Sequence, residues 1–126
     1  MARTPPPWLD RDLEDFDPRT GPILTDDDRA WLIGKLVIVG LTYLEADGET
    51  VATQAQYWGR VTDARADHGV TIMCEGVHAG KPCVVPLDLR SFSVASAGEY
   101  RLRSTGEVVI DPDLTSTWTI RKPSSH

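Results

Sequence analysis

The sequence lacks a long hydrophobic run. Its most apolar stretch, Trp31 to Leu44, is interrupted by Gly34, Lys35 and Gly40, whereas a membrane-spanning helix needs about 18 consecutive apolar residues. The chain opens Met-Ala-Arg-Thr-Pro-Pro-Pro, without the apolar segment of a secretory signal. We therefore expect a soluble, cytoplasmic protein with no membrane association.

Cysteine is also scarce, with two residues in the 126 of the chain. Cys74 and Cys83 flank a glycine-containing turn, so they can lie on adjacent strands. Since the cytosol keeps thiols reduced, two free and mostly buried thiols are the favoured interpretation, with a disulfide as an alternative. A metal site is less favoured, because the spacing of these cysteines around His78 supplies three ligands where a structural zinc site needs four.

Catalytic motifs are missing as well. There is no phosphate-binding loop, dinucleotide fingerprint or calcium loop. The three histidines lie beside turn glycines or at the end of the chain (His68, His78, His126). The acidic pairs are typical of a helix cap (Asp26, Asp28) and of an Asx-Pro turn (Asp111, Asp113). We therefore expect no catalytic residue, no cofactor, no metal site and no enzyme activity, unless a pocket brings His68 or His78 to a carboxylate.

What the sequence does contain is a segregated charge. Residues 1–50 hold eleven acidic and five basic side chains, whereas residues 51–126 hold eight of each, so the whole net charge of −6 belongs to the first segment. An acidic surface of this kind repels phosphates and attracts cationic partners. This argues against nucleic acid and favours a cationic protein as the partner.

The first 34 residues divide into an arm and a helix. Residues 1–24 are rich in proline and acidic groups, which predicts an irregular arm whose apolar residues pack on the domain. Thr25-Asp26-Asp27-Asp28 is typical of a capped helix start, and Gly34 is a natural stop. We predict one short helix over 25–34, held in place by Trp31, Leu32 and Ile33.

The remainder is rich in strand patterns separated by tight turns. Asp47-Gly48 is a strong hairpin signal, Gly59 indicates a bend or bulge, and residues 88–96 a loop or a single 3₁₀ turn. The predicted strands are 36–44, 50–64, 70–75, 81–87, 99–103, 107–110 and 117–121. Without βαβ crossovers the sheet should be antiparallel. We predict a mainly β domain over 25–121, either a small antiparallel barrel of the SH3-like kind or a curled sandwich, followed by a frayed tail at 122–126.

A nucleic-acid-binding barrel is the alternative function. Small β-barrels bind RNA or single-stranded DNA through a cationic groove with stacking aromatic residues. Arg60, Arg101 and Arg103 could form such a face beside Trp58 or Tyr100. The acidic balance of the chain opposes this interpretation, since phosphate contacts carry most of the non-specific affinity.

Two stretches carry a resemblance to a known group. Residues 31–43 (Trp-Leu-Ile-Gly-Lys-Leu-Val-Ile-Val-Gly-Leu-Thr-Tyr) and 98–109 (Gly-Glu-Tyr-Arg-Leu-Arg-Ser-Thr-Gly-Glu-Val-Val) lie in a small, acidic, cysteine-poor chain. In this general character it resembles bacterial immunity proteins of toxin–immunity systems, including contact-dependent growth inhibition. The resemblance implies a protein that binds and neutralises a cognate toxin domain, often a basic nuclease. It implies no particular fold and no residue roles.

The expected binding residues follow from charge and from aromatic content. Exposed Trp and Tyr are favoured as interface anchors, and peripheral charge sets the rate of association. Tyr57 and Trp58 are neighbours on one strand, so they should face opposite ways and one of them should point outward. The candidate residues are the acidic groups of the arm (Asp10, Asp12, Glu14, Asp15, Asp17), those of the first hairpin (Glu45, Asp47, Glu49), and three aromatic anchors (Trp8, Phe16, Trp58).

Overall fold

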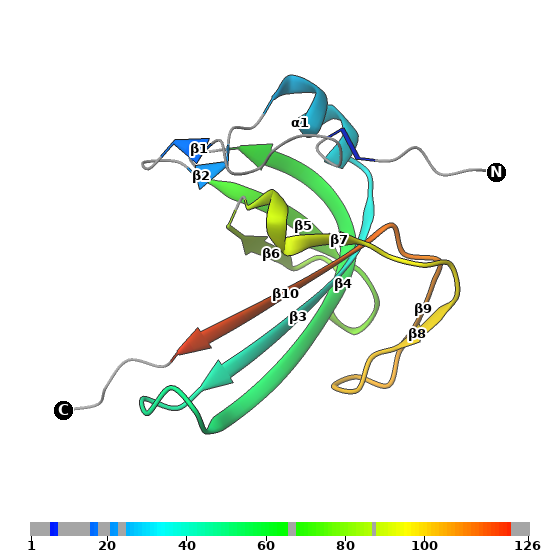
Figure 1. The fold of residues 1–126 in the computed structure, drawn as a ribbon. Coiled ribbons are helices and arrows are strands. Elements are labelled where there is room, and N and C mark those ends of the chain that lie inside the picture. Colours follow the sequence, from blue (N-terminus) through cyan, green and yellow to red (C-terminus); the bar gives the residue numbers. More distant parts are fainter. Residues whose placement is uncertain are drawn as a thin grey trace.

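The computed structural model describes residues 6–7, 16–17, 21–22, 25–65, 68–86 and 88–121. Its backbone is mainly β with one α-helix, as the sequence predicts (Figure 1). Of the predicted arm anchors and acids, Trp8, Asp10, Asp12, Glu14 and Asp15 lie outside the described residues. Phe16 and Asp17 form a short strand, but their side chains are also outside the description.

Ten strands, one α-helix and two 3₁₀ turns follow one another in this part of the chain. The strands are β1 (Phe16–Asp17), β2 (Gly21–Pro22), β3 (Leu36–Leu44), β4 (Val51–Arg65), β5 (Gly69–Cys74), β6 (Pro82–Val85), β7 (Phe92–Val94), β8 (Glu99–Arg101), β9 (Val108–Ile110) and β10 (Leu114–Arg121). The helix is α1 (Asp26–Leu32), and the 3₁₀ turns are η1 (Gly76–His78) and η2 (Leu89–Ser91). The short strand β7, inside the predicted loop 88–96, has no distinct sequence signal.

The main sheet has six strands in the order β6-β5-β4-β3-β10-β7, and β1-β2 and β8-β9 form separate two-stranded sheets. Four of its five pairings are antiparallel, but β10 runs parallel to β3, from Leu114 opposite Val37 to Arg121 opposite Leu44. The sequence argument missed this pairing, because the two strands are far apart in the chain. Asp113 sets their common direction: its Oδ2 accepts the Leu36 N–H at 2.8 Å, and its own N–H donates to the Leu36 carbonyl at 2.8 Å.

Strand β4 curls the sheet. Its 15 residues pair with β3 from Val51 to Arg60 and with β5 from Gly59 to Arg65, with a register shift between Val61 and Asp63. Gly59 permits a close crossing, since a Cβ there would stand 2.0 Å from the Met73 carbonyl oxygen. Within the described residues, no pairing joins the outer strands β6 and β7, so the curled sheet is open in its hydrogen bonding.

The two faces of β3 carry two hydrophobic clusters. Val37 and Val39 enter the main cluster with α1, β5 and β10, while Leu36 and Ile38 enter a second cluster with Leu102 and Val109. Alternate side chains of a strand point to opposite faces, so β3 contributes residues to both clusters. The second cluster attaches the β8–β9 hairpin to the sheet.

Helix α1 confirms the predicted short helix. Thr25 and Asp28 form a capping box: the Thr25 Oγ1 accepts the Asp28 N–H at 3.2 Å, and the Asp28 Oδ2 accepts the Thr25 N–H at 3.0 Å. Leu32 is fully buried and Trp31 packs on the main cluster, whereas Ile33 is 46% exposed. Two of the three predicted anchors therefore hold the helix.

Candidate functional site: a protruding three-stranded wing

Three strand segments extend past the main core as a wing (Figure 1). The wing comprises residues 40–44 of β3, 51–57 of β4 and 117–121 of β10. On one side β5 joins β4 only from Gly59 onward, and on the other β7 joins β10 only as far as Ser116. In the part of the chain that the structure describes, no strand pairs with the outer edges of the wing.

The predicted acidic hairpin forms the tip of this wing. Asp47 organises the turn: its Oδ1 accepts the N–H groups of Glu49 at 2.8 Å and Thr50 at 2.9 Å, and its Oδ2 accepts the Thr50 hydroxyl at 2.6 Å. These bonds, led by that from the Thr50 side chain, lower the pKa of Asp47. Glu45 and Glu49 are exposed beside it. The tip therefore offers two projecting glutamates on a turn held by a third carboxylate.

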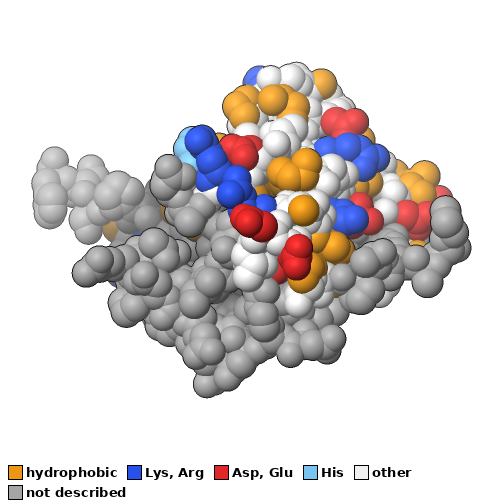
Figure 2. Space-filling view, turned by 90° about the horizontal axis from the view of Figure 1, so that it is seen from above, with side chains coloured by type: hydrophobic (Ala, Val, Ile, Leu, Met, Phe, Trp, Pro, Cys, Tyr) orange, Lys and Arg blue, Asp and Glu red, His pale blue; other side chains and the backbone are white. Residues whose placement is uncertain are grey.

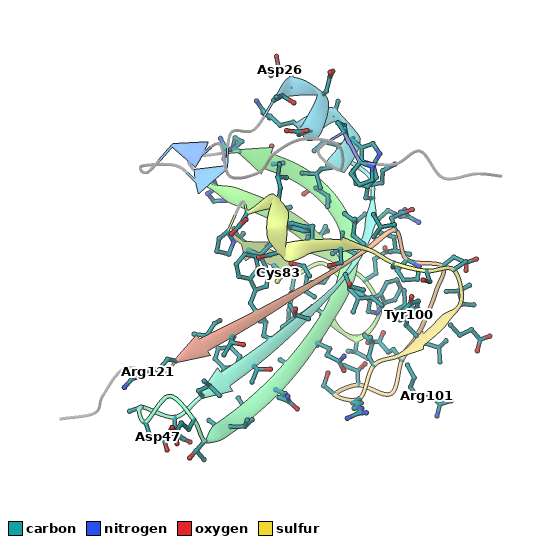
Figure 3. The ribbon with its side chains drawn as sticks, viewed as in Figure 1. Asp26, Asp47, Cys83, Tyr100, Arg101 and Arg121 are labelled. Atoms are coloured by element: carbon teal, nitrogen blue, oxygen red, sulfur yellow. The ribbon has the colours of Figure 1, made fainter. Side chains whose placement is uncertain are left out.

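The described acidic residues of the first segment do not form a single surface. Asp26 and Asp27 are exposed on the first turn of α1, and Figure 3 shows Asp26 and Asp47 at opposite ends of the molecule. Seen from the α1 side, acidic and basic side chains are interspersed among apolar ones (Figure 2). The hairpin tip is thus a separate acidic group, with the Arg121 guanidinium bonded to its Ala46 carbonyl.

One face of the wing carries an apolar strip, which we define as Leu41, Tyr43, Trp118 and Ile120. In the parallel register Trp118 lies beside Leu41 and Ile120 beside Tyr43. Leu41 and Trp118 pack on the main cluster, and the Trp118 indole donates to the Ser116 hydroxyl at 2.8 Å. Tyr43 is half-buried and Ile120 is 42% exposed. The strip therefore continues the core outward towards the acidic tip.

Since side chains alternate along a strand, the opposite face of the wing holds a groove of about 490 Å³. Its lining includes Thr42, Gln54 and Gln56 of the wing, the apolar Leu41, Ala55 and Trp118, and Arg103 and Ser104 of the turn between β8 and β9. The turn is bonded to β4, because the Gln56 N–H donates to the Ser104 Oγ and the Ser104 N–H donates to the Gln56 Oε1, both at 3.1 Å. We call this the wing groove.

A smaller pocket of about 380 Å³ shares Gln54, Gln56 and Ser104 with the wing groove and brings in His78 of η1. The His78 ring lies 4.6 Å from that of Tyr57, centroid to centroid, at 48°. Glu107 lies near His78 but does not line this pocket. The pocket therefore does not bring His78 to a carboxylate, which is the arrangement that would favour an enzyme.

The hydrogen bonds that Glu107 accepts show that its carboxylate has a structural role. Its Oε2 accepts the Trp58 indole N–H at 3.0 Å and the Val77 N–H at 3.1 Å, while its Oε1 is buried without a partner. Burial by itself raises the pKa of Glu107, but the bonds from Trp58, Thr105 and Val77 outweigh it and hold the pKa below its usual value. Glu107 thus ties η1 and β4 to the β8–β9 hairpin, a link that no local sequence pattern signals.

Trp58, the one predicted aromatic anchor whose side chain is described, is half-buried and packs on the second cluster, and Tyr57 packs on the main cluster. The two rings face opposite ways, as predicted, but each packs against a hydrophobic cluster and neither points freely outward. The wing itself supplies other candidate anchors, Tyr43 and Ile120. Tyr43 was not a predicted anchor, since burial on both faces was expected along 36–44.

The basic residues of the alternative function lie on two elements, with Arg60 on β4 and the other two on the β8–β9 hairpin. The Arg60 guanidinium donates to the Gly34 carbonyl at 3.1 Å and lies 4.0 Å from the Glu75 carboxylate. Arg101 lies on the β8–β9 hairpin (Figure 3), and Arg103 borders the wing groove. The described part of the chain shows no contact among the three.

Both cysteines are free thiols, Cys74 buried and Cys83 half-buried, which confirms the favoured interpretation. Burial raises the pKa of both, and the nearby Cys74 raises that of Cys83 further. Raised pKa values leave little thiolate at neutral pH, so these thiols are poor nucleophiles. Within the described residues, no three His, Cys, Asp or Glu side chains gather to hold a metal ion.

None of the helices in the described ranges is long and apolar enough to cross a membrane. Comparison of the chain with protein-family models, with curated proteins and with solved structures finds no match.

Proposed function

We propose that this chain is a binding protein that docks onto a cationic protein partner through the tip and apolar strip of its wing. The resemblance to immunity proteins suggests a cognate toxin domain as that partner, neutralised by the blocking of its active site or of an essential surface. In this proposal the chain is cytoplasmic, performs no chemistry and takes no cofactor.

One observation carries the proposal. The exposed Glu45 and Glu49 stand directly beyond Tyr43 and Ile120, at the end of a wing that no described strand flanks. Interfaces combine an apolar, aromatic-containing centre with a charged rim, and this wing places both on one projection. The arm residues Asp10, Asp12, Glu14, Asp15 and Asp17, with Trp8 and Phe16, stay a prediction from the sequence, since their side chains lie outside the described part of the chain.

The acidic tip gives the proposal a kinetic signature. Opposite charges steer encounter and raise association rates by roughly 10- to 10³-fold at low salt. The apolar strip would then set the lifetime of the complex, since buried apolar contacts act mainly on dissociation. A partner held in this way should associate more slowly as salt is added.

The test reverses the charge of the hairpin tip and leaves the hydrogen bonds of its turn in place. The double variant Glu45→Lys/Glu49→Lys keeps Asp47, whose bonds hold the hairpin. With a protein partner isolated from the native host, we expect association to slow about tenfold at low salt. The difference should fade at high salt in a stopped-flow measurement.

A matched control carries the same charge change elsewhere. Asp27 and Glu99 are exposed and lie outside the wing, so Asp27→Lys/Glu99→Lys should slow association much less. Equal rates for both double variants would show that only net charge matters and would remove the role of the tip. Binding of RNA or single-stranded DNA in a low-salt gel-shift assay, with no protein partner found, would favour the alternative function.

A further inference from the structure

The acidic tip of the wing is shaped by bonds within its own turn. Besides the bonds that Asp47 accepts, the Glu45 N–H donates to the Thr50 carbonyl at 2.7 Å, and the Gly48 N–H donates to the Glu45 carbonyl at 2.9 Å. The pairing of β3 with β4 is irregular directly before the tip, where its register shifts. These bonds fix the shape of the turn, but how the turn is held on the wing depends on contacts from outside it.

The contact from outside the turn comes from Arg121, the last residue of β10. Its guanidinium donates from both Nε and Nη2 to the Ala46 carbonyl, and the bond from Nε measures 2.8 Å. The side chain also lies against Gly48, since a Cβ at that glycine would stand 3.5 Å from the Arg121 Nε and 3.7 Å from its Cδ. Figure 3 shows Arg121 and Asp47 at the same end of the molecule. A residue 75 positions away from Ala46 thus fastens the tip to the third strand of the wing.

The charge of Arg121 is not paired with the carboxylates of the tip. Among the ion pairs of the described residues, none joins Arg121 to Glu45, Asp47 or Glu49. Its two donor groups converge instead on a neutral carbonyl oxygen, in a planar fork that the single nitrogen of a lysine does not reproduce. Glu45 and Glu49 therefore stay available to a partner, and the contribution of Arg121 to the tip is geometric.

We propose that Arg121 is the positioning residue of the acidic tip. Its fork to the Ala46 carbonyl holds the turn on the end of β10, so that Glu45 and Glu49 are presented to the partner in a fixed place. A segment that is already ordered loses less conformational entropy on binding, and such a gain acts mainly on the lifetime of the complex. The inference rests on the proposed function and adds the residue on which its charged surface depends.

The first test needs no partner. In the ¹⁵N-labelled full chain, we expect Arg121→Ala to lower the backbone order parameters of Gly48 and Glu49 from about 0.85, typical of rigid backbone, towards about 0.6. Arg103→Ala is the matched control, because it removes the same charge at the border of the wing groove, from a side chain with no described bond to the tip. The control should leave both residues as rigid as in the parent. Parental order parameters in Arg121→Ala would overturn the proposal.

Binding kinetics separate position from charge, because the two predict different results. Arg121→Ala makes the tip one charge unit more negative, so electrostatic steering alone would give faster association and an unchanged lifetime of the complex. Loss of positioning gives faster dissociation, which we expect to rise about fivefold because the side chains of Glu45 and Glu49 must then be ordered during binding. Faster association with parental dissociation would make Arg121 a charged residue only and overturn the proposal.

The conservative variant Arg121→Lys keeps the charge of the tip and removes the fork. We expect it to associate like the parent and to dissociate at a rate between those of the parent and Arg121→Ala. Parental dissociation and parental order parameters in this variant would show that charge at position 121 is sufficient, which contradicts positioning by the fork. Unchanged order parameters in the core strands verify that both variants fold.

The failure of this inference can be told apart from failure of the proposed function. A partner that loses steering in Glu45→Lys/Glu49→Lys, yet dissociates from Arg121→Ala as it does from Arg103→Ala, would keep the binding function and exclude positioning by Arg121. A tip that loosens in Arg121→Ala, while the charge reversal leaves association unchanged, would remove the proposed function and the inference with it.

Discussion

At the scale of single residues, the described carboxylates hold the fold together as well as charging its surface. Asp28 caps α1, Asp113 aligns β3 with β10, Asp47 organises the hairpin tip, and Glu107 joins three segments. Each accepts backbone or indole N–H donors from its own chain. An acidic composition alone therefore overstates how many carboxylates are available to a partner.

The lowered pKa of Glu107 predicts an acid-sensitive contribution to stability. A carboxyl group with a lowered pKa in the folded state stabilises the fold above its unfolded value of about 4.3, and this contribution is lost as the pH falls through the folded pKa. The difference in unfolding free energy between the parent and Glu107→Gln should be largest near neutral pH and shrink below pH 4.3. Urea unfolding followed by tryptophan fluorescence measures it, and a difference independent of pH would contradict the assignment.

At the scale of elements, the turn η1 shows how a short segment is positioned by its neighbours. Gly76 begins it with φ of +69°, a conformation that side chains rarely adopt. A Cβ at this position would stand 1.7 Å from the Glu107 Oε2 and 2.9 Å from the Trp58 Nε1. The glycine is needed for backbone conformation and for space at once, which lets η1 close over Glu107.

The same geometry predicts unequal effects at two glycines. Gly76→Ala should destabilise the chain by about 2–4 kcal/mol, because backbone strain and displacement of Glu107 add. Gly80 has a φ of +86° with nothing within 4 Å of an added Cβ, so Gly80→Ala should cost about 1 kcal/mol from strain alone. Urea denaturation measures both, and similar losses would show that space around Gly76 is unimportant.

At the scale of the whole molecule, β3 divides the apolar residues between two clusters on its two faces. The main cluster joins the curled sheet and α1, and the second holds the β8–β9 hairpin that borders the wing groove. The wing groove therefore depends on a small cluster of four buried residues, each of them at most 9% exposed. The shape of one wing face is set by contacts that lie outside the wing.

Truncation of a side chain in the second cluster should destabilise the β8–β9 hairpin more than the main sheet. Leu102 is 1% exposed, so Leu102→Ala should cost about 2–5 kcal/mol, with hydrogen exchange rising first in β8 and β9. Val108 is 42% exposed on the same hairpin, and Val108→Ala should stay within about 1 kcal/mol. Uniform loss of exchange protection across all strands in Leu102→Ala would contradict a separately attached hairpin.

The sequence by itself determined the features that depend on neighbours a few residues apart. The capping box spans Thr25 to Asp28, and the hairpin turn closes between Asp47 and Thr50. Alternation and turn residues likewise sufficed to predict a mainly β chain and the bounds of β3, because strand patterning and turn chemistry are local.

Only the tertiary structure decided what depends on residues far apart in the chain. The bond from Trp58 to Glu107 spans 49 positions, and that from Leu36 to Asp113 spans 77. The parallel β3–β10 pair, the inward placement of Trp58 and the open edge of β4 follow from such contacts. Local preferences leave many pairings equally acceptable, and the choice among them is made by burying the shared apolar surface and satisfying the polar groups that this burial encloses.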